Sequence, residues 1–205
     1  MTAMAMPRIE TVAPTVTKAR SDDAPLVFET LTQAFAADPA VRWMYPDPRQ
    51  YRRYFPAFAK AFGGAALARG TALVGGDCSG AALWLPPDAA PDEEALVAIL
   101  EESVADRERA DAFALFEEMG RHHPEEPHWY LPLIGVVPAQ QGRGLGSAIM
   151  EHGLALCDEA RLPAYLESTN PKNIPLYERH GFAVIGEIRI GRCPPIFPML
   201  RTARR

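Results

Sequence analysis

The chain of 205 residues lacks any apolar run that approaches the roughly 20 residues needed to cross a bilayer, so the sequence predicts no membrane span. Its start, MTAMAMPRIETVAPTVT, lacks the basic segment and long apolar core that mark a secretory signal. We expect residues 1–15 to form a flexible N-terminal tail. We also expect a cytoplasmic protein without a membrane partner.

Cysteine is scarce, and the three cysteines, Cys78, Cys157 and Cys193, are widely spaced with no CxxC pair. This spacing favours neither a disulfide framework nor a zinc site, and it is typical of free thiols in a reducing cytosol. His122 and His123 have no cysteine or further histidine at ligand spacing. We therefore expect no metal.

Positive charge is in the minority, because 21 lysines and arginines face 26 aspartates and glutamates and the net charge is −5. Proteins that bind nucleic acid neutralise its phosphates, so this balance argues against a nucleic-acid partner. It is compatible with a cationic substrate. The hydrophobic share of 48% and the length favour one globular domain.

Hydrophobic periodicity predicts a mixed order of strands and helices. We expect strands at 15–20, at two places around a glycine-rich turn within 71–87, and at 128–137, 163–169, 182–190 and 194–202. We expect helices at 21–39, 49–64, 144–162 and 173–181, and one long or two shorter helices within 90–127. Ser21 is the predicted N-cap of the first helix and Pro39 its end. Pro56 predicts a kink or break in the second helix, and Gly181 predicts the end of the last.

Three alternating glycines, Gly142, Gly144 and Gly146, stand between an apolar strand and a helix in the stretch GVVPAQQGRGLGSAIM. Backbone N–H groups at a helix start are free, and the helix dipole adds a partial positive charge there. Glycine permits close approach of a ligand and tolerates positive φ. This pattern predicts an anion cradle that needs no side-chain cation, with a tight turn that binds nothing as the alternative.

Two familiar phosphate loops do not fit these glycines. A nucleoside-triphosphate loop requires a lysine after the last glycine, and none follows. A dinucleotide loop requires a third glycine or an alanine where this chain has Ser147 or Ile149, depending on the frame. Glu167 lies at about the right separation for a ribose contact, so a nucleotide-dependent oxidoreductase stays open as a weaker alternative.

The spacing Gln141-x-x-Gly144-x-Gly146 follows Val137–Pro138, and NPKNIPLYERHGF follows the next predicted strand. These two motifs, in this order, resemble the GNAT acetyltransferases, which bind acetyl-coenzyme A. The likeness is strong from residue 127 to about 190 and covers the N-terminal half only by its order of elements. The lead-in HHPEEPHWYL is similar to that of the puromycin N-acetyltransferase branch.

The resemblance implies an α+β fold with a central, mostly antiparallel, twisted sheet, a splayed parallel strand pair and flanking helices. It implies one domain over residues 16–205 with a helical insertion around 91–121. It also implies acetyl-CoA as co-substrate. The residues that the resemblance assigns to coenzyme binding are Val136, Val137, Gln141, Gly142, Arg143, Gly144, Leu145, Gly146, Ser147, Asn170, Asn173 and Tyr177.

Within this set the resemblance gives some residues a role. The N–H of Val136 or Val137 would polarise the thioester carbonyl, and Asn173 would bind the pantetheine arm. Tyr177 would be the general acid, because a phenol is protonated at neutral pH and can protonate a leaving thiolate. A tyrosine that only packs in the core is the alternative for this position.

The general base is less determined by the sequence. Glu126 ranks first because it matches the lead-in, with His128, Glu167 or a water chain as alternatives. Glu167 could instead pair with Arg161, Arg179 or Lys172. If Tyr45 and Tyr54 line the acceptor site, an apolar or aromatic amine is favoured.

We therefore expect an N-acetyltransferase that moves the acetyl group from acetyl-CoA to a primary amine of a small molecule in a ternary complex. A non-catalytic module that binds or senses acyl-CoA is the alternative on the same fold. The resemblance also makes a homodimer one expected oligomeric state.

Overall fold

The computed structural model describes residues 14–204, so most of the expected N-terminal tail lies outside the described residues. Within this range a seven-stranded sheet runs in the order β1-β2-β3-β4-β5-β7-β6. Its strands are β1 (Val16–Lys18), β2 (Ala72–Gly75), β3 (Gly80–Leu85), β4 (Trp129–Val136), β5 (Ala164–Ser168), β6 (Ala183–Val184) and β7 (Phe197–Arg201). Neighbouring strands are antiparallel except β4 and β5, which are parallel. The predicted α+β fold with one parallel pair is confirmed.

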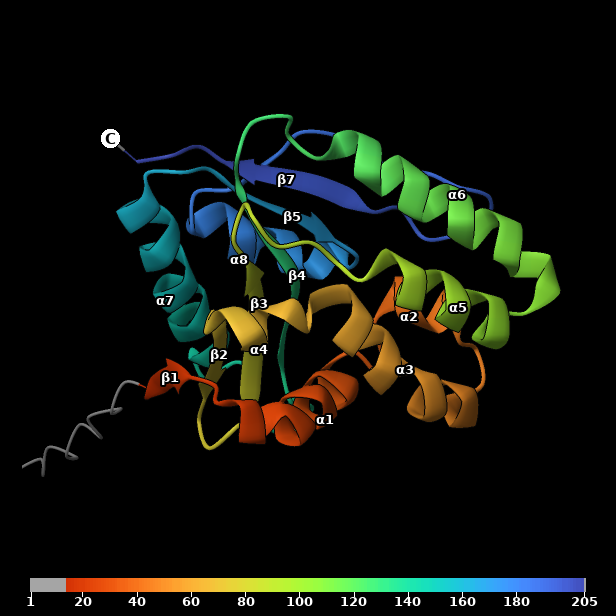
Figure 1. The fold of residues 1–205 in the computed structure, drawn as a ribbon, viewed down its shortest axis with the longest axis horizontal. Helices are drawn as coiled ribbons and strands as arrows, with labels where there is room; N and C mark the ends of the chain where they lie inside the picture. The colour runs from red at the N-terminus through yellow and green to blue at the C-terminus, as the bar shows by residue number, and fades with distance from the viewer. Residues whose placement is uncertain (1–13, 205) are drawn as a thin grey trace, which may run out of the picture.

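The helices are α1 (Ala24–Ala34), α2 (Pro39–Met44), α3 (Pro48–Gly63), α4 (Ala65–Arg69), α5 (Glu93–Ser103), α6 (Asp106–His122), α7 (Leu145–Ala160) and α8 (Ile174–Arg179). The range 91–121, where the resemblance implies a helical insertion, contains α5 and most of α6. Figure 1 shows α7 and the group α1, α3 and α4 on different sides of the strands. None of the helices within residues 14–204 combines the length and apolarity that a membrane span requires.

Two apolar cores lie on the two faces of the sheet, because successive strand residues point in opposite directions. On β3, Ala82 and Trp84 pack in the core beneath α7 and α8. Leu83 and Leu85 pack in the other core, which α1 to α6 cover. The helices before β2 and between β3 and β4 therefore form one layer, and the helices after β4 form the other.

Asp-Pro pairs begin two of the helices, which corrects the prediction for Pro39. Pro39 does not end the first helix but is the first residue of α2, where a missing N–H costs nothing. Asp38 precedes it as N-cap and accepts hydrogen bonds from the N–H groups of Ala40 and Val41. Asp47 caps α3 in the same way before Pro48.

Two further local predictions are wrong. Ser21 is not an N-cap, because it begins a short 3₁₀ turn that Asp23 closes by accepting a hydrogen bond from the Arg20 N–H at 2.8 Å. Pro56 does not break its helix, since α3 runs continuously from Pro48 to Gly63. The aromatic side chains that α3 buries on both sides of Pro56, including Phe55 and Phe58, offset the lost hydrogen bond.

The C-terminal strands are shorter than the sequence predicts. The expected strand at 182–190 is reduced to β6 and an isolated bridge between Ile188 and Ile196. β6 pairs with β7, so the predicted hairpin with a long connection is confirmed. Gly181, with φ of 91°, follows α8 as the predicted helix stop.

Two helical glycines give a matched test of the packing under α7. A Cβ on Gly153 would lie 2.0 Å from Trp84 Nε1, whereas a Cβ on Gly120 of α6 would meet no atom within 4 Å. We expect Gly153→Ala to lower the free energy of unfolding by about 1–3 kcal/mol or more. Gly120→Ala should raise it by roughly 0.5–1 kcal/mol. Urea denaturation of both variants measures this, and equal effects would contradict the packing described.

Candidate functional site

The site begins where β4 separates from β5. These strands pair only at Trp129–Ala164 and Tyr130–Tyr165, although β4 continues to Val136. On its other side β4 stays paired with β3, but it carries one extra residue between Tyr130 and Leu133. Such a bulge bends the strand and interrupts pairing. The predicted splayed pair is therefore present, and a gap opens between β4 and β5 beyond Tyr130.

The backbone of β4 presents free N–H groups to this gap. The Val137 N–H donates to the Ser79 carbonyl oxygen at 2.8 Å, on the β3 side. Because N–H groups alternate in direction along a strand, those of Ile134 and Val136 face the gap. Gln141 Nε2 donates to the Val136 carbonyl oxygen at 2.9 Å and so ties the following loop to the strand end.

The three glycines of the loop fall into two classes, those with a positive φ and one with ordinary φ beside open space. Gly142 and Gly144 have φ of 74° and 83°, which favour glycine directly. Gly146 has ordinary φ, and a Cβ there would meet nothing closer than Val136 Cγ2 at 3.7 Å. The N–H groups of Leu145 to Ser147 precede the first intrahelical bond of α7, which joins the Ala148 N–H to the Gly144 carbonyl. The loop thus presents free amides over an open surface.

An outer cleft of about 520 Å³ lies over this loop and the gap. The predicted coenzyme residues that line it are Val136, Gln141, Gly142, Gly144, Leu145, Gly146, Ser147, Asn170, Asn173 and Tyr177. Val137 and Arg143 do not line it, and Arg143 Nη1 instead donates to Gln140 Oε1 at 3.1 Å. Lys172 and Arg179 line the cleft although sequence reasoning did not select them.

A second, inner cavity of about 70 Å³ lies on the side of α2, α3 and α6. Its lining is largely apolar, with Phe58, Phe62 and Phe116 among its side chains. The outer cleft and the inner cavity share four lining residues, which are Phe35, Ile134, Asn173 and Tyr177. The two spaces therefore meet at Tyr177, beside the Ile134 backbone.

Tyr177 is buried at this junction, and its ring packs edge-on against Phe182 with 6.3 Å between centroids. Burial is the main influence that raises the pKa of its phenol, and the negative charge of Asp38 adds to it. The phenol is therefore protonated throughout the neutral range. Tyr177 is thus a packed core residue that keeps its phenolic proton at the meeting point of the two spaces.

The candidate bases divide into two groups. Glu126 is exposed and does not line the inner cavity; its backbone carbonyl accepts a hydrogen bond from His128 Nδ1 at 2.8 Å. The side chain of Glu167 is 3% exposed and lines the inner cavity. Glu167 Oε1 lies 3.2 Å from His123 Nε2, and none of the ion pairs among the described residues joins it to Arg161, Arg179 or Lys172.

His128, the third candidate, belongs with Glu167. Its Nε2 lies 3.2 Å from His123 Nδ1, so His123 stands between the two. Burial is the main influence that lowers the pKa of His128. Among residues 14–204, no group of three or more histidine, cysteine, aspartate or glutamate side chains is arranged to hold a metal ion.

Tyr45 and Tyr54 do not line either space. Tyr45 is fully buried and its hydroxyl bonds to Ser103 Oγ at 2.9 Å. Tyr54 donates to Glu102 Oε1 at 3.0 Å on the surface. The aromatic lining of the inner cavity comes from phenylalanines of α3 and α6 instead.

Asp38 is a site residue that sequence reasoning missed. It lines the outer cleft, caps α2, and accepts a hydrogen bond from Thr169 Oγ1 at 2.6 Å, which ties α2 to the end of β5. Its only sequence signal was the Asp-Pro pair. Burial raises the pKa of its carboxyl, although the hydrogen bonds from Thr169, Val41 and Ala40 oppose the shift.

Comparison with known proteins gives these features a family. A model of the Acetyltransferase (GNAT) family matches residues 34–182. The chain belongs to the GNAT acetyltransferase family. The match favours the acetyltransferase interpretation of the glycine loop over the dinucleotide one.

Individual proteins similar to this acetyltransferase are consistent with this family. An uncharacterised N-acetyltransferase of Schizosaccharomyces pombe is 26% identical in an alignment 190 positions long that covers 80% of this chain and 72% of the relative. A structure from Corynebacterium glutamicum, described as histone acetyltransferase HPA2 and related acetyltransferase, is 29% identical with a TM-score of 0.66, covering 95% of this chain and 98% of its own. Arylalkylamine N-acetyltransferase 2 of Aedes aegypti shares the fold at 15% identity and TM-score 0.66, over 94% of this chain and 100% of its own.

The buried carboxyl of Asp38 predicts a pH dependence of stability. Because its pKa is raised in the folded acetyltransferase, the folded state holds the proton more tightly than the unfolded chain does. Its contribution to stability is then largest at low pH and falls as the pH rises from about 4 through the raised pKa. Asn in its place can accept the bonds from Ala40 and Val41 at Oδ1 and donate from Nδ2 to the Thr169 hydroxyl, so it keeps three hydrogen bonds, with the Thr169 bond reversed, and carries no charge.

The ordinary pKa of an aspartate is about 4. We therefore expect the free energy of unfolding of the wild type, measured relative to that of Asp38→Asn, to decrease as the pH rises from this value toward neutrality. Denaturation of both proteins across this range measures the difference. A difference that stays constant or increases with pH would contradict the buried, destabilised carboxylate.

Proposed function

We propose that this acetyltransferase transfers the acetyl group of acetyl-CoA to a primary amine of a small apolar molecule, with both substrates bound together. One observation carries the proposal: the outer cleft and the inner cavity meet at Tyr177 and Ile134. Direct transfer needs this arrangement, because the two reacting groups must be held in contact.

The residues of the outer cleft fit a coenzyme with a pyrophosphate. The free N–H groups of Leu145 to Ser147 and the start of α7 favour an anion, and Gly146 leaves room for its approach. Nothing in the surrounding protein requires glycine at position 146, so a ligand is the best reason for it. Lys172 and Arg179, which also line the cleft, add positive charge.

The gap between β4 and β5 suits the pantetheine arm, which an extended strand with free N–H groups can bind. Acetyl-CoA supplies a thioester whose carbonyl carbon the amine attacks. The N–H of Ile134 or Val136 can polarise that carbonyl. Ile134 is better placed for this role because it lines both spaces. Tyr177 then supplies the proton that the leaving sulfur requires.

The inner cavity favours an acceptor with an apolar body and a cationic end. Phenylalanines of α3 and α6 supply apolar contacts, and among its described lining residues Glu167 carries the only carboxylate. With about 70 Å³ of free volume, it holds a small amine or the amine-bearing end of a larger one. The narrower resemblance, to puromycin N-acetyltransferases, makes aminonucleosides part of the acceptor panel, and a homodimer stays a prediction.

Gly146 gives the direct test of coenzyme binding. We expect Gly146→Val to weaken acetyl-CoA binding by roughly 10-fold or more, because the side chain would fill the anion cradle. Gly120→Val on α6 is the matched control, since its surroundings are also open but lie outside the cleft. Isothermal titration measures the affinity of both variants for acetyl-CoA. A folded Gly146→Val protein that binds acetyl-CoA as tightly as the wild type would contradict the cradle.

Tyr177 gives the test of the chemistry. We expect Tyr177→Phe to lower kcat by roughly 100-fold with little change in acetyl-CoA affinity, because it loses the proton donor and keeps the ring. Tyr54→Phe removes a phenol outside both spaces and serves as control. The assay measures the free CoA thiol that is released when each amine of a panel is offered as acceptor. If the wild type binds acetyl-CoA but turns over no amine, a sensing module becomes the better account.

A further inference from the structure

We propose that Glu167, His123 and His128 form a proton relay that takes the proton from the bound ammonium and releases it at the protein surface. The inference rests on the proposed function, because it names the base of that same reaction. It replaces the single exposed carboxylate of Glu126 with three side chains from β5, from the end of α6 and from the start of β4. Sequence reasoning selected two of them separately and could not place His123 between them.

The three side chains form one continuous chain of contacts. Glu167 Oε1 lies 3.2 Å from His123 Nε2, and His123 Nδ1 lies 3.2 Å from His128 Nε2. The side chain of Glu167 is buried against the inner cavity, whereas His128 is partly exposed. The chain therefore leads from the acceptor site toward solvent.

The hydrogen bonds determine which ring nitrogens carry protons. The Glu126 carbonyl can only accept, so His128 Nδ1 donates to it and Nε2 of neutral His128 is an acceptor. His123 Nδ1 must then donate to His128, which leaves Nε2 of neutral His123 facing the Glu167 carboxylate. A proton between these two atoms would join them, and in the relay one mobile proton moves between Glu167 and His123.

The surroundings hold His123 in this position. Its ring lies 4.5 Å from the rings of both Tyr130 and Tyr165, measured between centroids. Its backbone is extended after α6, as expected for a residue before proline, and Pro124 and Pro127 restrict the loop that returns to His128. These contacts set the ring orientation that the relay needs.

Glu167 also has two phenol neighbours, Tyr130 and Tyr165. Glu167 Oε1 has no well-aligned hydrogen-bond donor among the described residues. Both phenols can donate to Glu167; burial first, and then the charge of Glu167 and hydrogen bonding to it, raise the pKa of both, so they stay protonated. Burial lowers the pKa of His128, which leaves its ring neutral and able to accept a proton. A bound ammonium would supply a further donor to Glu167.

The proton balance of the reaction matches a one-proton relay. The ammonium passes a proton to Glu167, the mobile proton moves onto His123 Nε2, and His123 Nδ1 passes its proton to His128 Nε2. The neutral amine then forms the C–N bond as the C–S bond breaks; Tyr177 protonates the sulfur and recovers the surplus proton of the nitrogen. The products are an amide, a free thiol and one proton, which His128 releases to water as the rings return to their starting tautomers.

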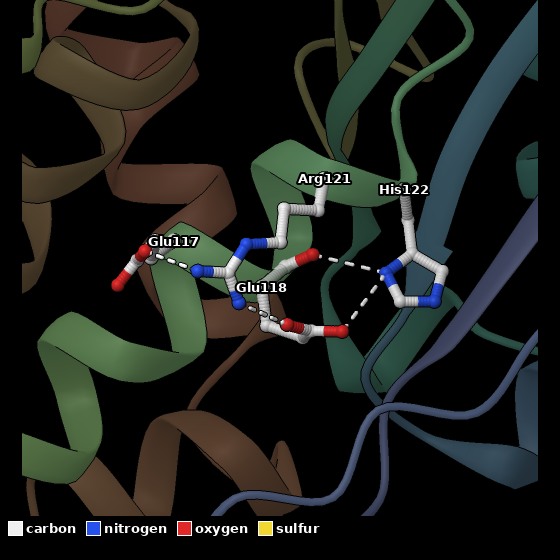
Figure 2. A network of polar contacts seen from close by, with 4 residues as sticks. All are labelled: Glu117, Glu118, Arg121 and His122. Carbon is white, nitrogen blue, oxygen red and sulfur yellow. Dashed lines mark hydrogen bonds and ion pairs between the residues drawn. The ribbon is translucent and has the colours of Figure 1, made fainter.

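The neighbouring histidine is a matched control. His122 Nδ1 bonds to the Glu118 carbonyl at 2.9 Å, within α6, and lies 3.7 Å from the Glu118 carboxylate, as Figure 2 shows. Glu118 also pairs with Arg121, so this network is confined to the end of the helix. His122 lines neither the outer cleft nor the inner cavity. His122→Ala should therefore leave turnover unchanged.

The first experiment needs no acceptor. Long-range ¹H–¹⁵N NMR of histidine side chains, at a pH where the rings are neutral, should find the Nδ1–H tautomer at both His123 and His128. An Nε2–H tautomer at either ring in the resting protein would break the chain and overturn the relay. Because this result does not depend on activity, it applies even if the wild type acetylates no amine, which would defeat only the proposed function.

The second experiment uses an amine that the wild type acetylates. Glu167→Gln should lower kcat/KM near pH 7 by roughly 100-fold or more with unchanged acetyl-CoA affinity. His123→Ala and His128→Ala should also lower it, and their deficits should shrink as the pH approaches the pKa of the amine, because the substrate then arrives already neutral. His128→Ala, at a partly exposed position, covers the case in which Glu167→Gln fails to fold.

Three outcomes would overturn the relay while leaving the proposed function standing. Deficits of equal size at every pH would show that the histidines only support the fold. Full activity in folded Glu167→Gln would remove the base. Loss of activity in Glu126→Gln, with Glu167→Gln active, would return the role to the exposed carboxylate.

Discussion

The separation of β4 from β5 is the constraint on which the rest of the site depends. One extra residue on β4, between Tyr130 and Leu133, coincides with the end of the pairing to β5. Beyond that point the strand keeps its bonds to β3 and turns free N–H groups toward an open gap. The outer cleft reaches the gap from the glycine loop, and the inner cavity reaches it from the helical layer.

The two core layers explain why this gap stays open without weakening the molecule. On one face, α7 packs on β1 to β4 through residues such as Trp84 and Ile149. On the other, α1, α3, α5 and α6 share one core with β4, and α3 and α6 line the inner cavity. β5 is held from its far side by five paired residues of β7. The strands that border the gap are therefore fixed by other neighbours, so their missing contact is available to ligands.

Local patterns in the sequence predicted most helices and strands and the glycine loop, because these depend on residues close together in the chain, whereas the sheet topology and the other predicted residues of the outer cleft came from the family resemblance. Gly142, Gly144 and Gly146 act within one turn, and Gly181 ends one helix. The failures have a common cause in long-range contacts. The contact between Thr169 and Asp38 spans 131 residues, and only the folded sheet brings Glu167 to His123. Pro56 stays helical because of the aromatic core around α3, which no local rule contains.

A crystal structure of the complex with acetyl-CoA tests the central claim most directly. The account predicts the pantetheine arm in the gap between β4 and β5, the pyrophosphate on the amides of Leu145 to Ser147, and the thioester carbonyl within hydrogen-bond reach of the Ile134 or Val136 N–H, next to Tyr177. An ordered coenzyme bound elsewhere, with the gap left free of ligand, would contradict it.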